Sequence, residues 1–180
     1  MKTGSTIIKQ TVRTADVTVS GLLIALVFVA TEFINIRLPI SVNGGLIHFG
    51  NVMLFVSSIL FGRKKGALAG AFGMGLFDIV SGWMAWAPFT FIIRGVMGYI
   101  IGTIANNKNK NGSSFLYNLT AIVVGGIWMI AGYYLTEVIL YGNWLSPMTS
   151  IAGNIIQIAI GAVVGLPLVS ALKKFKIFNK

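Results

Sequence analysis

Long apolar runs alternate along this chain with short polar stretches. The runs predict six membrane-spanning helices, at about 17–36, 46–61, 66–82, 89–105, 115–141 and 151–172. A bilayer core of roughly 30 Å takes about 20 helical residues, so the run at 46–61 is short for a span. Membrane strands would show short alternating segments, whereas these runs are continuous and rich in Ala, Gly, Leu and Ile. The pattern therefore predicts an all-α integral membrane protein.

Composition supports this fold class. Of the 180 residues, 56% are hydrophobic and only 10% are charged, and the mean hydropathy is +0.85. Soluble domains carry about 25% charged residues. Because the apolar runs fill most of the chain, we expect one six-helix membrane domain over residues 1–180, without a soluble appendage or a signal peptide. The chain has no cysteine, which excludes disulfides, Cys-ligated zinc and iron–sulfur clusters.

Basic residues in the loops give the chain a net charge of +10 and predict its orientation. Short basic clusters between apolar runs are typical of topology signals, so nucleic acid is not expected as a partner. The segments before the first span and after the second, fourth and sixth hold twelve Lys and Arg residues, against Arg37 alone in the other loops. Cytoplasmic loops carry the positive excess, so both termini are predicted in the cytoplasm and the protein in the cell membrane.

The polar residues of the predicted spans gather near their outer ends. The group comprises Glu32, His48, Asn51, Asp78, Arg94, Tyr133, Tyr134, Glu137, Asn154 and Gln157. An interfacial position explains Glu32 alone equally well, but six helices sharing one polar depth favour a cavity that opens to the outside. We expect Arg94 to pair there with Asp78 or Glu137.

The stretch "WMAWAPFTFIIRG", residues 83–95, adds two indoles near this depth. An indole beside a cavity offers a flat wall on which an aromatic ligand can stack. A place in the interfacial aromatic belt is the alternative for any one tryptophan. We expect Trp86 to stack on a ligand ring, Glu137 to bind its polar edge, and Trp83 to be a belt residue.

Small residues at four-residue spacing mark two helices for close packing. Gly66 and Gly70 begin such a ladder in the third predicted span, where packing inside the bundle is the favoured interpretation. Gly21 and Ala25 form a shorter pair in the first span, and this pair would also suit a membrane partner.

Together these features resemble the substrate-binding S component of energy-coupling factor (ECF) vitamin transporters. The most specific stretch is residues 38–102, which begins "LPISVNGGLIHFGNVMLF" and ends "FIIRGVMGYIIG". It looks like the branch assigned to hydroxymethylpyrimidine or vitamin B6 precursors, and is related more loosely to riboflavin and thiamine members.

The resemblance implies a capture subunit that binds its vitamin from outside and topples in the membrane to carry it inward. It implies a transmembrane scaffold (T) component and two cytoplasmic ATPases as partners, so that ATP is used by those partners and this chain carries no cofactor or metal. Gly21 and Ala25 would dock the scaffold, with Gly in place of the usual first Ala. With the polar residues above, the expected substrate site is Asn43, His48, Asp78, Trp86, Arg94, Tyr134, Glu137, Asn154 and Gln157.

Other function classes fit the sequence less well. There is no P-loop and no HExxH motif, and the single His48 has no nucleophile near it in sequence, so we expect no enzyme. A stand-alone channel would need polar residues through the full depth of the membrane. An S component for riboflavin or thiamine stays open as the alternative.

Overall fold

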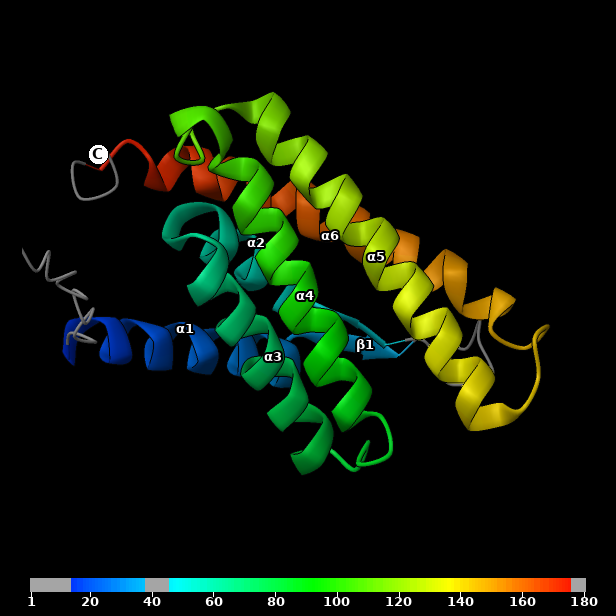
Figure 1. The fold of residues 1–180 in the computed structure, drawn as a ribbon. Coiled ribbons are helices and arrows are strands. Elements are labelled where there is room, and N and C mark those ends of the chain that lie inside the picture. The colour runs from blue at the N-terminus through cyan, green and yellow to red at the C-terminus, as the bar shows by residue number, and fades with distance from the viewer. Residues whose placement is uncertain (1–13, 38–45, 176–180) are drawn as a thin grey trace, which may run out of the picture.

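The computed structural model describes residues 14–37 and 46–175, which form a helical bundle with one small hairpin (Figure 1). The elements in chain order are α1 (Thr14–Phe33), β1 (Asn35–Arg37), β2 (Leu46–His48), α2 (Gly50–Phe61), α3 (Arg63–Val80), α4 (Ala87–Ala105), the 3-10 turn η1 (Asn107–Asn109), α5 (Phe115–Tyr141) and α6 (Met148–Leu172). The helices confirm the predicted all-α class, and α5 has the bounds that the sequence predicted.

The hairpin corrects two predicted boundaries. β1 and β2 pair in antiparallel register, with Ile36 opposite Ile47. The first predicted span therefore ends as a helix at Phe33, and the second does not begin at Leu46, because strand pairing takes up the first residues of that run. Three-residue strands are too short to show the alternation by which strands are found in sequence.

Within the described part of the chain, four helices are long and apolar enough to cross a membrane: α1, α4, α5 and α6. α3 has 18 residues but begins with three basic ones. α2 has only 12 residues, a rise of about 18 Å, which is less than the roughly 30 Å of a bilayer core. It contacts α1, α3, α4 and α6, so it lies inside the bundle.

Glycines bring α3 and α4 into close contact. A Cβ on Gly98 would meet the backbone of Gly66, and one on Gly70 would meet the carbonyl of Arg94. The small-residue ladder of the third predicted span is therefore used for packing inside the bundle, as expected. This contact holds Arg94 at a fixed position relative to α3.

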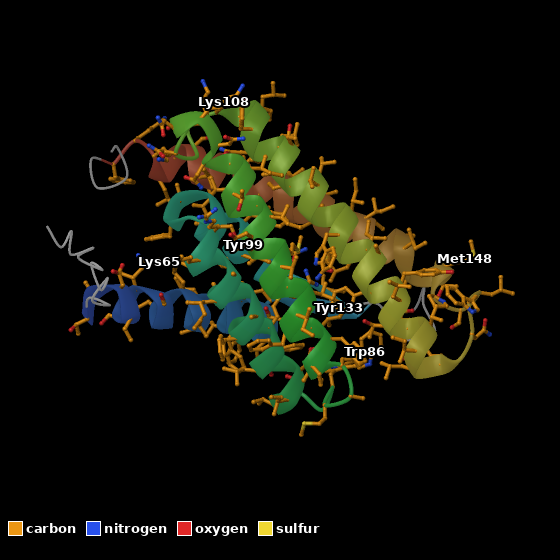
Figure 2. All side chains as sticks on the ribbon, in the orientation of Figure 1. Lys65, Trp86, Tyr99, Lys108, Tyr133 and Met148 are labelled. Carbon is orange, nitrogen blue, oxygen red and sulfur yellow. The ribbon has the colours of Figure 1, made fainter. Side chains whose placement is uncertain are left out.

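The two ends of the bundle differ in chemistry. Figure 2 shows Lys65 and Lys108 at one end, and Trp86 and Met148 toward the other. The hairpin and the α3–α4 and α5–α6 connections lie at the second end (Figure 1). This is the end at which the sequence placed the polar residues of the spans.

Candidate substrate site

A cavity of about 120 Å³ lies among the helix ends and the hairpin. Its walls come from α1, β2, α3, α4, α5, α6 and the α3–α4 connection. The lining residues are Thr31, Leu46, His48, Met74, Phe77, Asp78, Trp83, Trp86, Thr90, Arg94, Tyr133, Glu137, Ser150, Gly153, Asn154 and Gln157. Seven of the nine residues that the sequence proposed for the site are among them, so one cavity brings together side chains from most of the chain.

Arg94 is the buried centre of the polar lining. It is 3% exposed, and its Nη1 donates to Asn51 Oδ1 at 2.6 Å while its Nε donates to the Tyr133 hydroxyl at 3.0 Å. The guanidinium also lies 5.0 Å from the centroid of the Tyr133 ring, a cation–π contact. Helix α2, through Asn51, and helix α5, through Tyr133, thus fix this charge from two sides.

These contacts revise the expected pairing of Arg94. The sequence favoured a direct ion pair with Asp78 or Glu137, and all three residues line the cavity. The hydrogen bonds of Arg94, however, go to neutral acceptors: the oxygens of Asn51 and Tyr133 and the sulfurs of Met97 and Met129. A guanidinium carries five N–H donors in a fixed planar arrangement. Neutral acceptors placed around it can therefore satisfy its hydrogen bonds when it is buried. The Asp78 carboxylate interacts with Arg94 through its charge.

The carboxylates of the cavity are held by hydroxyl groups. Glu137 is 3% exposed and its Oε2 accepts a hydrogen bond from Ser150 Oγ at 2.8 Å. Asp78, 8% exposed, interacts with the side chain of Thr90. Glu32 is not among the lining residues of this cavity, and its Oε2 accepts from Ser81 Oγ at 2.6 Å. Two carboxylates therefore face the cavity, from α3 and α5.

Three buried polar atoms of the lining have no hydrogen-bond partner in the described structure. They are Nδ1 of His48, Oδ2 of Asp78 and Nε2 of Gln157. A buried polar atom without a partner costs about 1–3 kcal/mol, and such atoms in a cavity mark places where a ligand can complete the hydrogen bonding. The three atoms offer one acceptor, one donor and one imidazole nitrogen that can be either.

Aromatic rings form one wall of the cavity. The rings of Trp86 and Tyr133 lie 6.2 Å apart at 46°, and Trp86 also lies 6.2 Å from the ring of Tyr141. Trp83 lines the cavity as well, so its expected role as a belt residue is revised. Both indoles of the stretch at 83–95 belong to the site.

One proposed site residue lies outside the cavity, and another is not among the described residues. Tyr134 is not among the lining residues; its hydroxyl donates to the Trp144 carbonyl at 2.7 Å, whereas the adjacent Tyr133 lines the cavity. Consecutive helical residues point about 100° apart, so only one of the pair can face the site. Asn43 lies outside the described residues.

Sequence reasoning missed several hydroxyl-bearing residues of the lining. Thr31, Thr90 and Ser150 were not proposed, although each lines the cavity. Thr90 precedes Arg94 by four residues, and this spacing puts both on one helix face, so the signal was present. Among residues 14–37 and 46–175, no group of three His, Asp or Glu side chains could hold a metal ion.

The proposed docking pair lies on the outside of α1. Gly21 and Ala25 are exposed, and a Cβ on Gly21 would meet no atom within 4 Å. The buried face of α1 is instead formed by Leu23, Val27, Ala30 and Thr31. Gly21 and Ala25 therefore do not belong to the face of α1 that packs inside the described part of this chain.

Comparison with known families identifies the chain. The model of the family described as "ECF-type riboflavin transporter, S component" matches residues 11–174. The chain belongs to the ECF transporter S components. It is a multi-pass membrane protein and a transporter subunit, not an enzyme, and its family implies a vitamin as the captured substrate and association with T and ATPase components.

Two relatives are similar to this chain over most of its length. The thiamine precursor transporter HmpT of Lactococcus lactis subsp. cremoris (strain MG1363) is 28% identical over 155 residues, which covers 86% of this chain and 86% of that protein. An uncharacterized protein in the gap 3' region of Pyrococcus woesei is 33% identical over 139 residues, which covers 77% of this chain and 90% of that protein.

Proposed function

We propose that this S component captures a single-ring heteroaromatic vitamin precursor of the hydroxymethylpyrimidine type. The size of the cavity, about 120 Å³, carries the proposal. An enclosed protein cavity of about 150 Å³ accommodates benzene; the cavity here is of that order and is open on one side, so it matches a single six-membered ring whose substituents extend toward the opening. Riboflavin, with its tricyclic ring system and ribityl chain, is much larger. The similarity to a thiamine precursor transporter supports the same ligand class.

The polar lining complements an aminopyrimidine. The ring offers a donor at its amino group next to an acceptor at a ring nitrogen. Asp78 Oδ2 can accept from the amino group, and Gln157 Nε2 can donate to the ring nitrogen; both atoms are buried and lack partners in the described structure. His48 Nδ1 or Asn154 can bind the hydroxymethyl group from β2 or α6. Hydrogen bonds of this kind discriminate strongly, because a ligand without them leaves buried groups unpaired.

The aromatic wall supplies the remaining affinity. Trp86, with Tyr133 beside it, offers a face for the pyrimidine ring. Stacking of a nucleobase on an aromatic side chain contributes about 1–3 kcal/mol, and a pyrimidine precursor presents a similar π face. Pyridoxine has the same ring size and three hydroxyl groups, and is the second candidate.

The proposal includes the orientation and the partners. All six helices would cross or enter the membrane, with both termini and the Lys65 and Lys108 end in the cytoplasm, because the basic loops lie at that end. The cavity would then open outward. The exposed pair Gly21 and Ala25 on α1 would pack against the T component, and two ATPase subunits would supply the energy.

Calorimetry on the purified chain tests the ligand. It should be titrated separately with hydroxymethylpyrimidine, pyridoxine, thiamine and riboflavin. We expect hydroxymethylpyrimidine to bind most tightly and riboflavin to bind at least about 100-fold more weakly, a difference of roughly 2.7 kcal/mol. Riboflavin binding as tight as that of the pyrimidine would contradict the proposal and favour the riboflavin function by which the matching family model is described.

Labelling of introduced cysteines tests the orientation, since the natural chain has none. In intact cells an impermeant thiol reagent should modify a cysteine at Trp144 and should not modify one at Lys65 or Lys108. The reverse pattern would place the cavity on the cytoplasmic side.

A further inference from the structure

A second, wider depression lies at the opposite end of the bundle from the substrate cavity. This basic groove has a volume of about 910 Å³ and lies where α2 ends and α3 begins. The α4–α5 connection and the residue after α6 complete its walls. Its basic lining residues are Arg63, Lys65, Lys108 and Lys173. Figure 2 shows Lys65 and Lys108 at this end, away from Trp86.

The charge in the basic groove is one-sided. None of the described residues that line it is acidic. Asp16 forms a salt bridge with Lys65 at 2.8 Å, and the Arg63 guanidinium lies 5.4 Å from the centroid of the Tyr99 ring. Partial burial lowers the pKa of the Lys173 ammonium from its ordinary value, a desolvation effect that a bound anion would offset. Cations from three separate segments thus favour a negatively charged ligand.

The other lining residues suit the headgroup region of a lipid. Leu60 and Phe61, from the last turn of α2, add apolar surface, while asparagines between residues 106 and 111 add amide donors. Basic pockets between membrane helices on the cytoplasmic side bind anionic headgroups. Topology signals explain why lysines occur in these loops. They do not require that α3, η1 and the end of α6 direct their cations into one groove.

We propose that the basic groove binds the phosphodiester headgroup of an anionic phospholipid, such as phosphatidylglycerol, in the cytoplasmic leaflet. The placement in that leaflet rests on the orientation given under the proposed function; the binding chemistry does not. Lys108 and Lys173 hold the phosphate by charge, and the apolar end of α2 contacts the start of the acyl chains. A free phosphate ion carries related chemistry without acyl chains, so the test separates the two.

Native mass spectrometry of the full chain in detergent measures this binding directly. The protein is titrated with phosphatidylglycerol, with zwitterionic phosphatidylcholine and with inorganic phosphate. The groove variant Lys108→Gln/Lys173→Gln is compared with Lys64→Gln/Lys174→Gln, which removes the same charge at the same end from residues that do not line the groove. Thermal unfolding should be the same for both variants, which would show that both are folded. The readout is lipid retention, and it does not depend on vitamin binding.

We expect phosphatidylglycerol to be retained in preference to phosphatidylcholine. Each lysine near an anionic surface contributes about a 5-fold change in affinity, so the groove variant should lose roughly 30-fold and the single variant Lys108→Gln about 5-fold. The control pair should lose less than the single variant. Equal losses of phosphatidylglycerol affinity in the two double variants would show that only the overall positive charge matters, and would overturn the proposed site. Retention of inorganic phosphate as strong as that of phosphatidylglycerol would overturn the lipid assignment.

Discussion

Replacement of Arg94 by methionine tests the role of the buried charge in the site. The guanidinium joins three helices, because α4 carries it, α2 accepts from it through Asn51 and α5 through Tyr133. Methionine fills a similar length of the side-chain space but can donate to neither oxygen. The substitution should therefore weaken both the fold and the shape of the aromatic wall.

The expected loss of stability follows from what the substitution leaves behind. Asn51 is 0% exposed and its Nδ2 already lacks a partner, so loss of the bond to its Oδ1 leaves the whole amide unpaired. A buried group in that state costs about 1–3 kcal/mol. Loss of the positive charge near Asp78 adds to this, and relief of the guanidinium desolvation offsets part of it. We expect a net loss of about 2–3 kcal/mol in the free energy of unfolding.

Chemical denaturation in detergent micelles, followed by tryptophan fluorescence, measures this loss. Arg63→Met is the matched control, because Arg63 is exposed and lies over the Tyr99 ring at the end of the bundle opposite the cavity. Substitutions of exposed residues change the free energy of unfolding by about 0.5 kcal/mol or less. Calorimetry should show at least about a 10-fold loss in hydroxymethylpyrimidine affinity for Arg94→Met, since Tyr133 loses its anchor. Unfolding and ligand binding equal to those of Arg63→Met would refute a structural role for the Arg94 contacts.

Four further substitutions test the aromatic wall, the docking face and the helix packing. Trp86→Ala and Trp83→Ala should each weaken ligand binding roughly 5- to 150-fold by calorimetry. Trp144 is exposed and does not line the cavity, so Trp144→Ala should leave the affinity unchanged. An unchanged affinity for Trp86→Ala would show that the ligand ring stacks elsewhere. Gly21→Leu should abolish uptake into cells but preserve ligand binding and thermal stability, because its added atoms enter open space; normal uptake would remove this face as a docking surface. Gly98→Ala should lower the free energy of unfolding by about 1–3 kcal/mol or more, because its Cβ would meet the Gly66 backbone. A stability equal to that of Gly21→Leu would contradict the close α3–α4 contact.

Most helix positions could be predicted from the sequence, because the lengths of the apolar runs and the residues at their ends indicate the same boundaries. α5 begins at Phe115 after Ser114 and ends before Gly142, which adopts the left-handed conformation with φ of 64°. Such a glycine is a common helix terminator, so the bounds of this helix followed from local signals. The β1–β2 hairpin had no comparable signal, because the apolar residues of β2 continue directly into the apolar run of α2.

The depth of the site within the membrane could be predicted from the sequence, but the contacts between its residues could not. Topology and helix length place His48, Asp78, Arg94 and Glu137 at one end of the bundle, and the cavity contains all four. The partner of Arg94 depended on the rotation of α2 and α5 about their axes. Charge alone favours a carboxylate partner for Arg94, whereas the structure brings Asn51 and Tyr133 within hydrogen-bonding distance. Such rotations depend on tertiary packing, which residue spacing within one helix does not specify.

The short central helix separates the two ends of the molecule. Asn51, in the first turn of α2, accepts a hydrogen bond from Arg94 of the substrate cavity, and the last residues of α2 line the basic groove. Between them Leu54, Phe55 and Ile59 are fully buried in the hydrophobic core. A polar ligand that crossed this core would lose its hydrogen bonds without replacement, at a cost of several kcal/mol. The packing therefore disfavours conduction of a polar ligand through the described interior, which a stand-alone channel would require.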